Sequence, residues 1–144
     1  MATQLTAEDA RSSLTEHAAS KGAEIHEAYG PNLGWSELLS LLKDRRFVRY
    51  PCAVKFDEAD LEPGEFGHAS PVGDRPDAGF VISIHPFFLT QLDRVPALVL
   101  YQLVLVNYGD FASPDDAEAF GAAALGLPRE AYYEQICDLS DQLE

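Results

Sequence analysis

The chain has little cysteine and no apolar leader. Only Cys52 and Cys137 occur among its 144 residues, and we expect both to be free thiols that act as small buried hydrophobic groups in a strand and a helix. The residues that follow Met1 contain no segment typical of a signal peptide or a membrane anchor. These absences predict a cytoplasmic protein that needs neither a disulfide nor a metal ion to fold.

Basic residues are also scarce. Asp and Glu number 24 against 10 Lys and Arg, which gives a formal net charge of −14. Binding to nucleic acid is disfavoured because no basic face is available to neutralise phosphates. The one basic concentration, Lys43, Arg45, Arg46 and Arg49, follows a short expected helix, and we expect these cations to complement its C-terminal dipole rather than to bind phosphate. The acidity favours solubility, salt adaptation or a basic partner protein.

The common catalytic signatures are missing as well. The sequence has no recognisable Ser-His-Asp or Cys-His arrangement and no glycine-rich phosphate loop. Of its four histidines, His17 and His26 are expected to be solvated on the first helix, whereas His68 falls in an expected loop. His85 ends an expected strand. A metal site built from His68, His85 and Asp116 therefore remains an open alternative.

The main feature that is present is an apolar segment from residue 97 to residue 106, interrupted by Gln102. A helix that is apolar on all sides must be buried among other elements, and this one is shorter than the roughly 20 apolar residues that a bilayer requires. Asp93 is a suitable N-cap, Pro96 suits the first turn and Gly109 suits the end. We therefore predict a buried central helix over about 94–107.

Two strands and four further helices are expected around this helix. Alternating apolar residues predict a half-buried strand near 48–56, in which Pro51 indicates an edge or a strand start, and a second strand at 80–85. The stretch 61–79 is rich in glycine and proline and is expected to be a loop, with at most a short strand at 66–68.

The first helix is expected from about residue 7 to 29, with a cap in the segment beginning at Thr6 and a candidate break at Gly22. A second helix over 36–43 is capped by Ser36 and buries four leucines, Leu39 among them. The last two helices begin after Ser113 and at Pro128. The order of elements predicts a single α+β domain over residues 1–144, with a small twisted sheet packed on the central helix.

This order resembles the minimal zincin-like metallopeptidases, particularly the ImmA/IrrE type. In that family the central helix carries His-Glu-x-x-His, whose two histidines bind zinc while the glutamate activates the metal-bound water. The apolar framing of residues 100–106 resembles the surroundings of that motif and puts Tyr101, Gln102 and Leu105 at its three functional positions. Residues 116–122 resemble the family's Glu-Ala-x-x-Phe-Ala, which puts Asp116 at the position of the third zinc ligand.

The residues at these positions exclude zincin-type hydrolysis. Leu105 has no lone pair, Tyr101 is a poor zinc ligand because the pKa of a phenol is near 10, and Gln102 cannot act as a base. Asp116 is explained by a capping role at the start of its helix. Gln102, polar within an apolar run, is expected to form a hydrogen bond with neighbouring backbone. We therefore predict no catalytic residue, no bound metal and no cofactor.

The resulting hypothesis is a non-catalytic zincin-like protein, a binding or regulatory module for an unknown protein or peptide partner, without membrane contact. Its vestigial cleft would be formed by Tyr101, Gln102, Leu105, Asp116 and His85, because the family's strand before the central helix borders the cleft. Two other classes remain open. One is an acidic interaction module that docks a basic partner, and the other is a hydrolase with a non-standard metal site.

Overall fold

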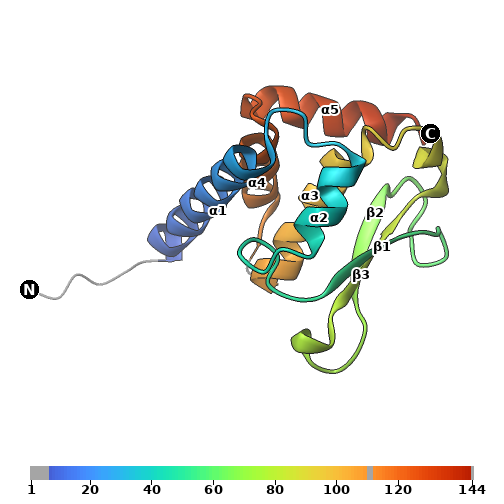
Figure 1. Ribbon diagram of the computed structural model, residues 1–144, viewed down its shortest axis with the longest axis horizontal. Coiled ribbons are helices and arrows are strands. Elements are labelled where there is room, and N and C mark those ends of the chain that lie inside the picture. The colour runs from blue at the N-terminus through green and yellow to red at the C-terminus, as the bar shows by residue number, and fades with distance from the viewer. Residues whose placement is uncertain (1–6, 110–111, 144) are drawn as a thin grey trace, which may run out of the picture.

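An α+β fold is formed by helices that pack on a small mixed sheet. The computed structural model describes residues 7–109 and 112–143, with side chains from residue 13 onward. Along this part of the chain the elements are α1 (Ala7–Tyr29), α2 (Trp35–Leu42), β1 (Cys52–Phe56), β2 (Gly67–Pro71), η1 (Pro76–Ala78), β3 (Phe80–Ile84), η2 (Pro86–Thr90), α3 (Val95–Tyr108), α4 (Pro114–Leu125) and α5 (Arg129–Asp141). The helices lie to one side and the sheet to the other, with α3 between them (Figure 1).

The sheet has the strand order β1-β3-β2, so β3 is central and the other two strands are edges. β1 runs parallel to β3 and β2 runs antiparallel to it. The strand expected near 48–56 is present but begins only at Cys52, because Val48 still belongs to the turn after α2 and donates its N–H to the carbonyl of Asp44 at 2.9 Å. Pro51 precedes this edge strand, so its missing N–H removes no hydrogen bond from the sheet.

β2 occupies a stretch that the sequence predicts to be mainly loop. Its five residues include Gly67 and Pro71 and contain no large apolar side chain, so intrinsic preference does not favour a strand there. The strand forms because the apolar β3 offers a pairing partner along all five positions. Tertiary pairing therefore overrides the local signal, and the short strand expected at 66–68 is extended.

α3 is buried on nearly all sides, as the apolar segment predicts. Leu98, Leu100 and Leu103 have no exposed surface, and Gly109 ends the helix with a positive φ of 67°. The expected cap at Asp93 is wrong, because the helix begins at Val95 and Arg94 before it already has right-handed helical backbone angles. Successive turns from η2 lead into α3, so no extended capping residue is needed. No helix in the described residues is long and apolar enough to cross a membrane.

α1 and α4 pack along each other, and Gly22 permits their close approach. A Cβ atom at Gly22 would lie 2.4 Å from the carbonyl oxygen of Phe120 and 2.9 Å from Cβ of Ala123. The expected break at Gly22 is wrong, because α1 continues through it to Tyr29. The glycine serves contact between helices and not a change of direction. The expected cap at Thr6 lies outside the described residues.

α5 is fastened to the core through Tyr132. The ring of this fully buried side chain lies against Gly121 of α4, where a Cβ atom would come within 2.2 Å of Cζ. Its hydroxyl donates a hydrogen bond to the carbonyl of Ala97 in α3 at 2.7 Å. The missing side chain at Gly121 thus makes room for an aromatic ring from the next helix.

α2 begins one residue earlier than expected. Gly34 precedes it in extended conformation, and the backbone N–H of Gly34 donates to Oε1 of Glu37 at 3.0 Å. Ser36 lies inside the helix, so its expected capping role is wrong. Leu38, Leu41 and Leu42 face the core, but Leu39 is 41% exposed because it projects from the opposite side.

Candidate functional site

Tyr101 and Leu105 lie one turn apart on the side of α3 that faces the start of α4. They line a small, mainly apolar cavity of about 130 Å³, whose other residues are Val104, Ala112, Ser113, Pro114 and Ala117. The Tyr101 ring meets the ring of Phe66 edge-on, with 5.8 Å between centroids. Leu105 is 41% exposed. This cavity is where the resemblance would put a pair of zinc-binding histidines.

Gln102 points away from this cavity and toward β2. It is 6% exposed, and its Nε2 donates a hydrogen bond to the carbonyl oxygen of Gly67 at 3.2 Å. The predicted hydrogen bond to neighbouring backbone is therefore confirmed. The amide fixes α3 to the start of β2, and a carboxylate in its place would have no proton to offer to that carbonyl.

Asp116 is fully buried and holds the start of α4. Its Oδ2 accepts a hydrogen bond from the backbone N–H of Ser113 at 2.9 Å, and its Oδ1 accepts one from the hydroxyl of Thr15 in α1 at 2.5 Å. The predicted capping role is confirmed. Because successive helical residues point about 100° apart, the neighbouring Ala117, and not Asp116, lines the cavity beside Tyr101 and Leu105.

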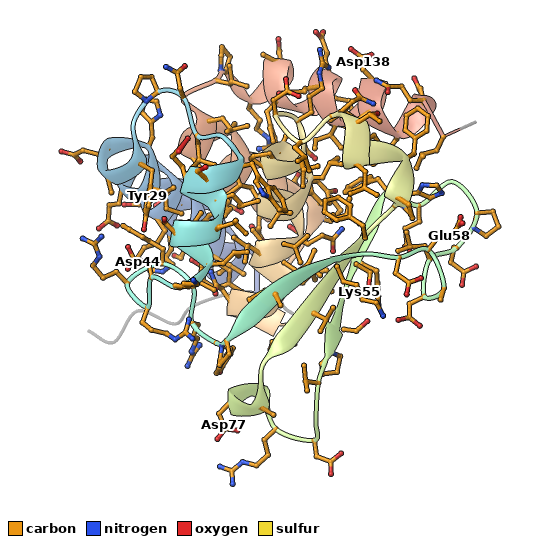
Figure 2. All side chains as sticks on the ribbon, turned by 45° about the vertical axis from the view of Figure 1, so that its right-hand side comes forward. Tyr29, Asp44, Lys55, Glu58, Asp77 and Asp138 are labelled. Atoms are coloured by element: carbon orange, nitrogen blue, oxygen red, sulfur yellow. The ribbon has the colours of Figure 1, made fainter. Side chains whose placement is uncertain are left out.

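His85 sits at the end of β3, near the start of β2. Its backbone N–H donates to the carbonyl of Phe66 at 2.9 Å, and its Nδ1 accepts from the N–H of Phe87 at 3.1 Å, which caps η2. Its Nε2 lies 3.1 Å from Oε2 of Glu58, on the loop that follows β1 (Figure 2). Both imidazole nitrogens are thus engaged by local partners.

The alternative metal site of His68, His85 and Asp116 is not brought together. Within residues 7–109 and 112–143, no three His, Cys, Asp or Glu side chains cluster closely enough to hold a metal ion. His68 is exposed on β2, His85 contacts Glu58, and Asp116 is turned toward α1. The three residues therefore do not form the ligand set that this alternative requires.

A larger groove of about 500 Å³ adjoins the small cavity at Leu105, which lines both. Three parts of the chain line it. They are the strand β2, the C-terminal half of α3, and the aromatic residues Tyr50 and Phe80, whose ring centroids lie 5.9 Å apart. The full set of lining residues is Arg49, Tyr50, His68, Ala69, Pro71, Pro76, Phe80 and the five residues from Leu105 to Gly109.

The outer edge of β2 runs beside this groove. Next to the two ends of β2, the carbonyl of Phe66 accepts from the N–H of His85, and the N–H of Val72 donates to the carbonyl of Gly79. In an antiparallel pair, successive residues direct their backbone groups alternately toward the partner strand and away from it. Gly67, Ala69 and Pro71 therefore direct their backbone groups away from β3. The Gly67 carbonyl accepts from Gln102, and proline has no N–H. Ala69 therefore presents a donor and an acceptor at this edge, neither of which is bonded within residues 7–109 and 112–143.

Burial raises the pKa of two tyrosines, one in the lining of the small cavity and one in the lining of the groove. Burial, assisted by the negative charge of Glu118, raises the pKa of Tyr101. Burial, assisted by Asp116, raises the pKa of Tyr108. Both cysteines are free and half-buried, and burial raises the pKa of the Cys52 thiol to about 11. Tyr101, Tyr108 and Cys52 therefore stay protonated at neutral pH, so none of these three is an activated nucleophile or general base there.

Comparison of the chain with protein-family models, with curated proteins and with solved structures gives no match.

The free edge of β2 and the role of Ala117 are the parts of the site that sequence reasoning missed. An alanine carries no chemical signal, and its place beside Tyr101 and Leu105 depends on how α4 is rotated against α3. A weak signal for β2 does exist, because a turn-rich stretch directly before an apolar strand is typical of a hairpin.

Proposed function

We propose that this chain is a non-catalytic zincin-like binding module of the cytoplasm, which receives an extended segment of a partner protein or peptide along the free edge of β2. The observation that carries the proposal is the edge at Ala69, which has no strand paired with it among the described residues and runs beside a groove of about 500 Å³. The zincin-like relation itself rests on the framing of Tyr101, Gln102 and Leu105 in the sequence, and the contact of α3 with β2 is compatible with it.

An extended segment suits this surface for two reasons. A strand added to a sheet edge gains main-chain hydrogen bonds, and its alternate side chains point to one face. The N–H and carbonyl of Ala69 would form those bonds, while alternate apolar side chains would enter the groove and cover the exposed part of Leu105. Pro71 limits the edge that can pair, so the bound segment is short.

The net charge of −14 adds a preference among such segments. Long-range attraction accelerates the approach of a basic segment and repels an acidic one, and the effect weakens as salt increases. Glu118, whose charge acts on Tyr101 at the small cavity, contributes to this preference locally. The acidity predicted to dock a basic partner then acts at long range on the approach of the segment and not through the groove lining, which contains Arg49 and no carboxylate.

Selection of peptides from a random display library, followed by fluorescence polarisation of the best binders, tests the proposal. Ala69→Pro removes the outward N–H without removing a bond to β3, and we expect it to weaken binding at least tenfold. Leu105→Glu should have a similar effect because it introduces a charge into the apolar wall. Leu89→Glu, at an exposed leucine of η2, is the matched control and should bind as the parent does.

Binding that is unchanged in both Ala69→Pro and Leu105→Glu would overturn the proposal, because the selected peptides would then use another surface. Methylation of alternate backbone nitrogens in the peptide provides a second measurement. One of the two methylation patterns should abolish binding if the peptide pairs as a strand, whereas equal affinity for both patterns would contradict strand addition.

A further inference from the structure

Basic side chains collect in a second cavity that adjoins the groove. Its volume is about 200 Å³, and it is lined by His17, Lys21, Arg45, Arg46, Phe47, Arg49, Asn107 and Tyr108. Four of the ten Lys and Arg of the chain are in this set, and none of the 24 Asp and Glu is. Since acidic residues outnumber basic ones in the sequence, this composition is the reverse of what an arbitrary surface hollow would have. We call it the basic pocket.

The basic pocket is assembled from distant parts of the chain. Lys21 and His17 come from α1, and the arginines come from the segment after α2. Asn107, near the end of α3, holds that segment in place at two points. Its Nδ2 donates to the carbonyl of Phe47 at 2.8 Å, and its Oδ1 accepts from the N–H of Arg49 at 2.9 Å. The backbone that carries Arg49 is therefore fixed against a buried helix.

The cations in the pocket differ in how far they are already neutralised. Arg46 is paired with Asp44 at 2.7 Å, and this contact is the main reason why the pKa of Asp44 lies well below its usual range. Asp44 also accepts a hydrogen bond from the Tyr29 hydroxyl, and the two residues lie next to each other in Figure 2. Lys21 is within 3.5 Å of Glu24.

Arg45 and Arg49 have no carboxylate partner within salt-bridge distance among the described residues. Arg45 makes long contacts of 3.4 and 3.5 Å to the carbonyls of Leu42 and Val48, so only part of its donor capacity serves the end of α2. The Arg49 guanidinium lies over the Tyr50 ring at 5.4 Å. Two guanidinium groups thus retain donors for an anion.

The basic pocket and the groove form a continuous surface, because Arg49, Asn107 and Tyr108 line both. One end offers four Lys and Arg side chains, and the other offers aromatic and apolar walls at Tyr50 and Phe80. We infer that this surface binds a small phosphomonoester with an aromatic or apolar body, its phosphate in the basic pocket and its body in the groove. Guanidinium groups match phosphate geometry, and charge-assisted bonds to phosphate are among the stronger hydrogen bonds.

Titration of the full chain with inorganic phosphate, phenyl phosphate and phenol tests this inference, with ionic strength matched by sodium chloride and binding followed by amide chemical shifts in NMR. We expect phenyl phosphate to bind at least tenfold more tightly than inorganic phosphate, and phenol alone to bind weakest. Shifts should appear at Arg49 and at the side-chain amide of Asn107.

Three variants assign the two ends of the site. Lys21→Gln should weaken both phosphate probes at least threefold, and Arg49→Gln should weaken both at least tenfold. Tyr50→Ala should weaken phenyl phosphate and leave inorganic phosphate unchanged. Arg94→Gln removes an exposed charge before α3 and should change nothing.

The inference is overturned if Arg49→Gln and Lys21→Gln bind both phosphate probes as the parent does. It is also overturned if Arg94→Gln reduces binding as much as they do, because net charge and not the pocket would then be responsible. Equal affinity for inorganic phosphate and phenyl phosphate would contradict the role of the groove. Peptide binding at Ala69 is measured in a separate experiment. Failure of the phosphate inference therefore does not decide whether a peptide pairs with the edge of β2.

Discussion

Gln102 is the residue at which the chemistry expected of a zincin and the structure of this chain differ most clearly. Its amide donates to the Gly67 carbonyl in a buried position between α3 and β2. A glutamate here would place a carboxylate against a carbonyl oxygen. The side chain at the position where the resemblance would put a catalytic base therefore has a structural role in this protein.

Gln102→Glu should destabilise the protein, and the loss should depend on pH. At pH 8 the buried carboxylate has lost the donor to Gly67, and we expect a loss of about 3 kcal/mol in the free energy of unfolding. Burial raises the pKa of such a carboxyl above its ordinary value of about 4.3. The protonated form can donate to Gly67, so the loss should be smallest below pH 4 and grow as pH rises through the raised pKa.

Urea denaturation at several pH values between 4 and 8 measures this effect. Gln102→Met, which removes the donor without adding a charge, is the control, and its loss of about 1–2 kcal/mol should not vary with pH relative to the parent. A Gln102→Glu variant as stable as the parent at pH 8 would mean that the amide is not needed between α3 and β2.

Among the elements, α3 was the most predictable and β2 the least. The apolar run from 97 to 106 indicates a buried helix whatever surrounds it, and Gly109 marks its end without reference to the rest of the chain. The start was missed because Asp93 is a good cap only if its own backbone is extended, and here Asp93 belongs to the turns after η2 that lead directly into the helix. Local chemistry thus predicted the existence of the helix better than its boundary.

The candidate site was predicted only in part, because part of it depends on contacts between residues far apart in sequence. Tyr101 and Leu105 share a face because the period of a helix puts them there. Whether Asp116 or Ala117 faces them depends on the rotation of α4, which is set by Thr15 in α1 and by the packing of Phe120. Such contacts join residues far apart in sequence. The edge of β2 was missed likewise, because β3 and not local preference makes it a strand.

Two leucines of α3 differ in burial, and the difference predicts different effects on stability. Leu103 has no exposed surface and Leu105 is 41% exposed. Leu103→Ala should lower the free energy of unfolding by about 2–5 kcal/mol, because it leaves a cavity in the core, and Leu105→Ala should lower it by less than about 1 kcal/mol. Urea denaturation gives both values. Equal losses at the two sites would contradict the orientation of α3.

Charge is distributed unevenly over the protein. The net charge of −14 repels anions at long range, yet the basic pocket gathers four of the Lys and Arg residues at one place. At physiological ionic strength the screening length is about 8 Å, so local guanidinium groups outweigh distant carboxylates for a ligand in contact with them. The acidic surface and a local anion site are therefore compatible.

We propose that α3 and α4 are arranged as in a zincin, with the zinc ligands replaced. A direct test introduces ligands at three positions that line the cavity of about 130 Å³, through Tyr101→His, Leu105→His and Ala117→Glu, with Ala117 used because Asp116 is turned away from the cavity. Gln102 is kept because it fastens β2. The control carries the two histidines with Ala117 unchanged, so that Asp116 is the only carboxylate in the family's ligand position.

Zinc per chain, measured by elemental analysis after dialysis, is the deciding quantity. We expect about one zinc per chain in the triple variant, since two His and one Glu with a water complete a tetrahedral site. Its melting temperature should rise when zinc is added. The control should retain far less zinc, because Asp116 is turned toward Thr15. A triple variant that folds but retains no more zinc than the control would contradict the zincin-like arrangement of α3 and α4.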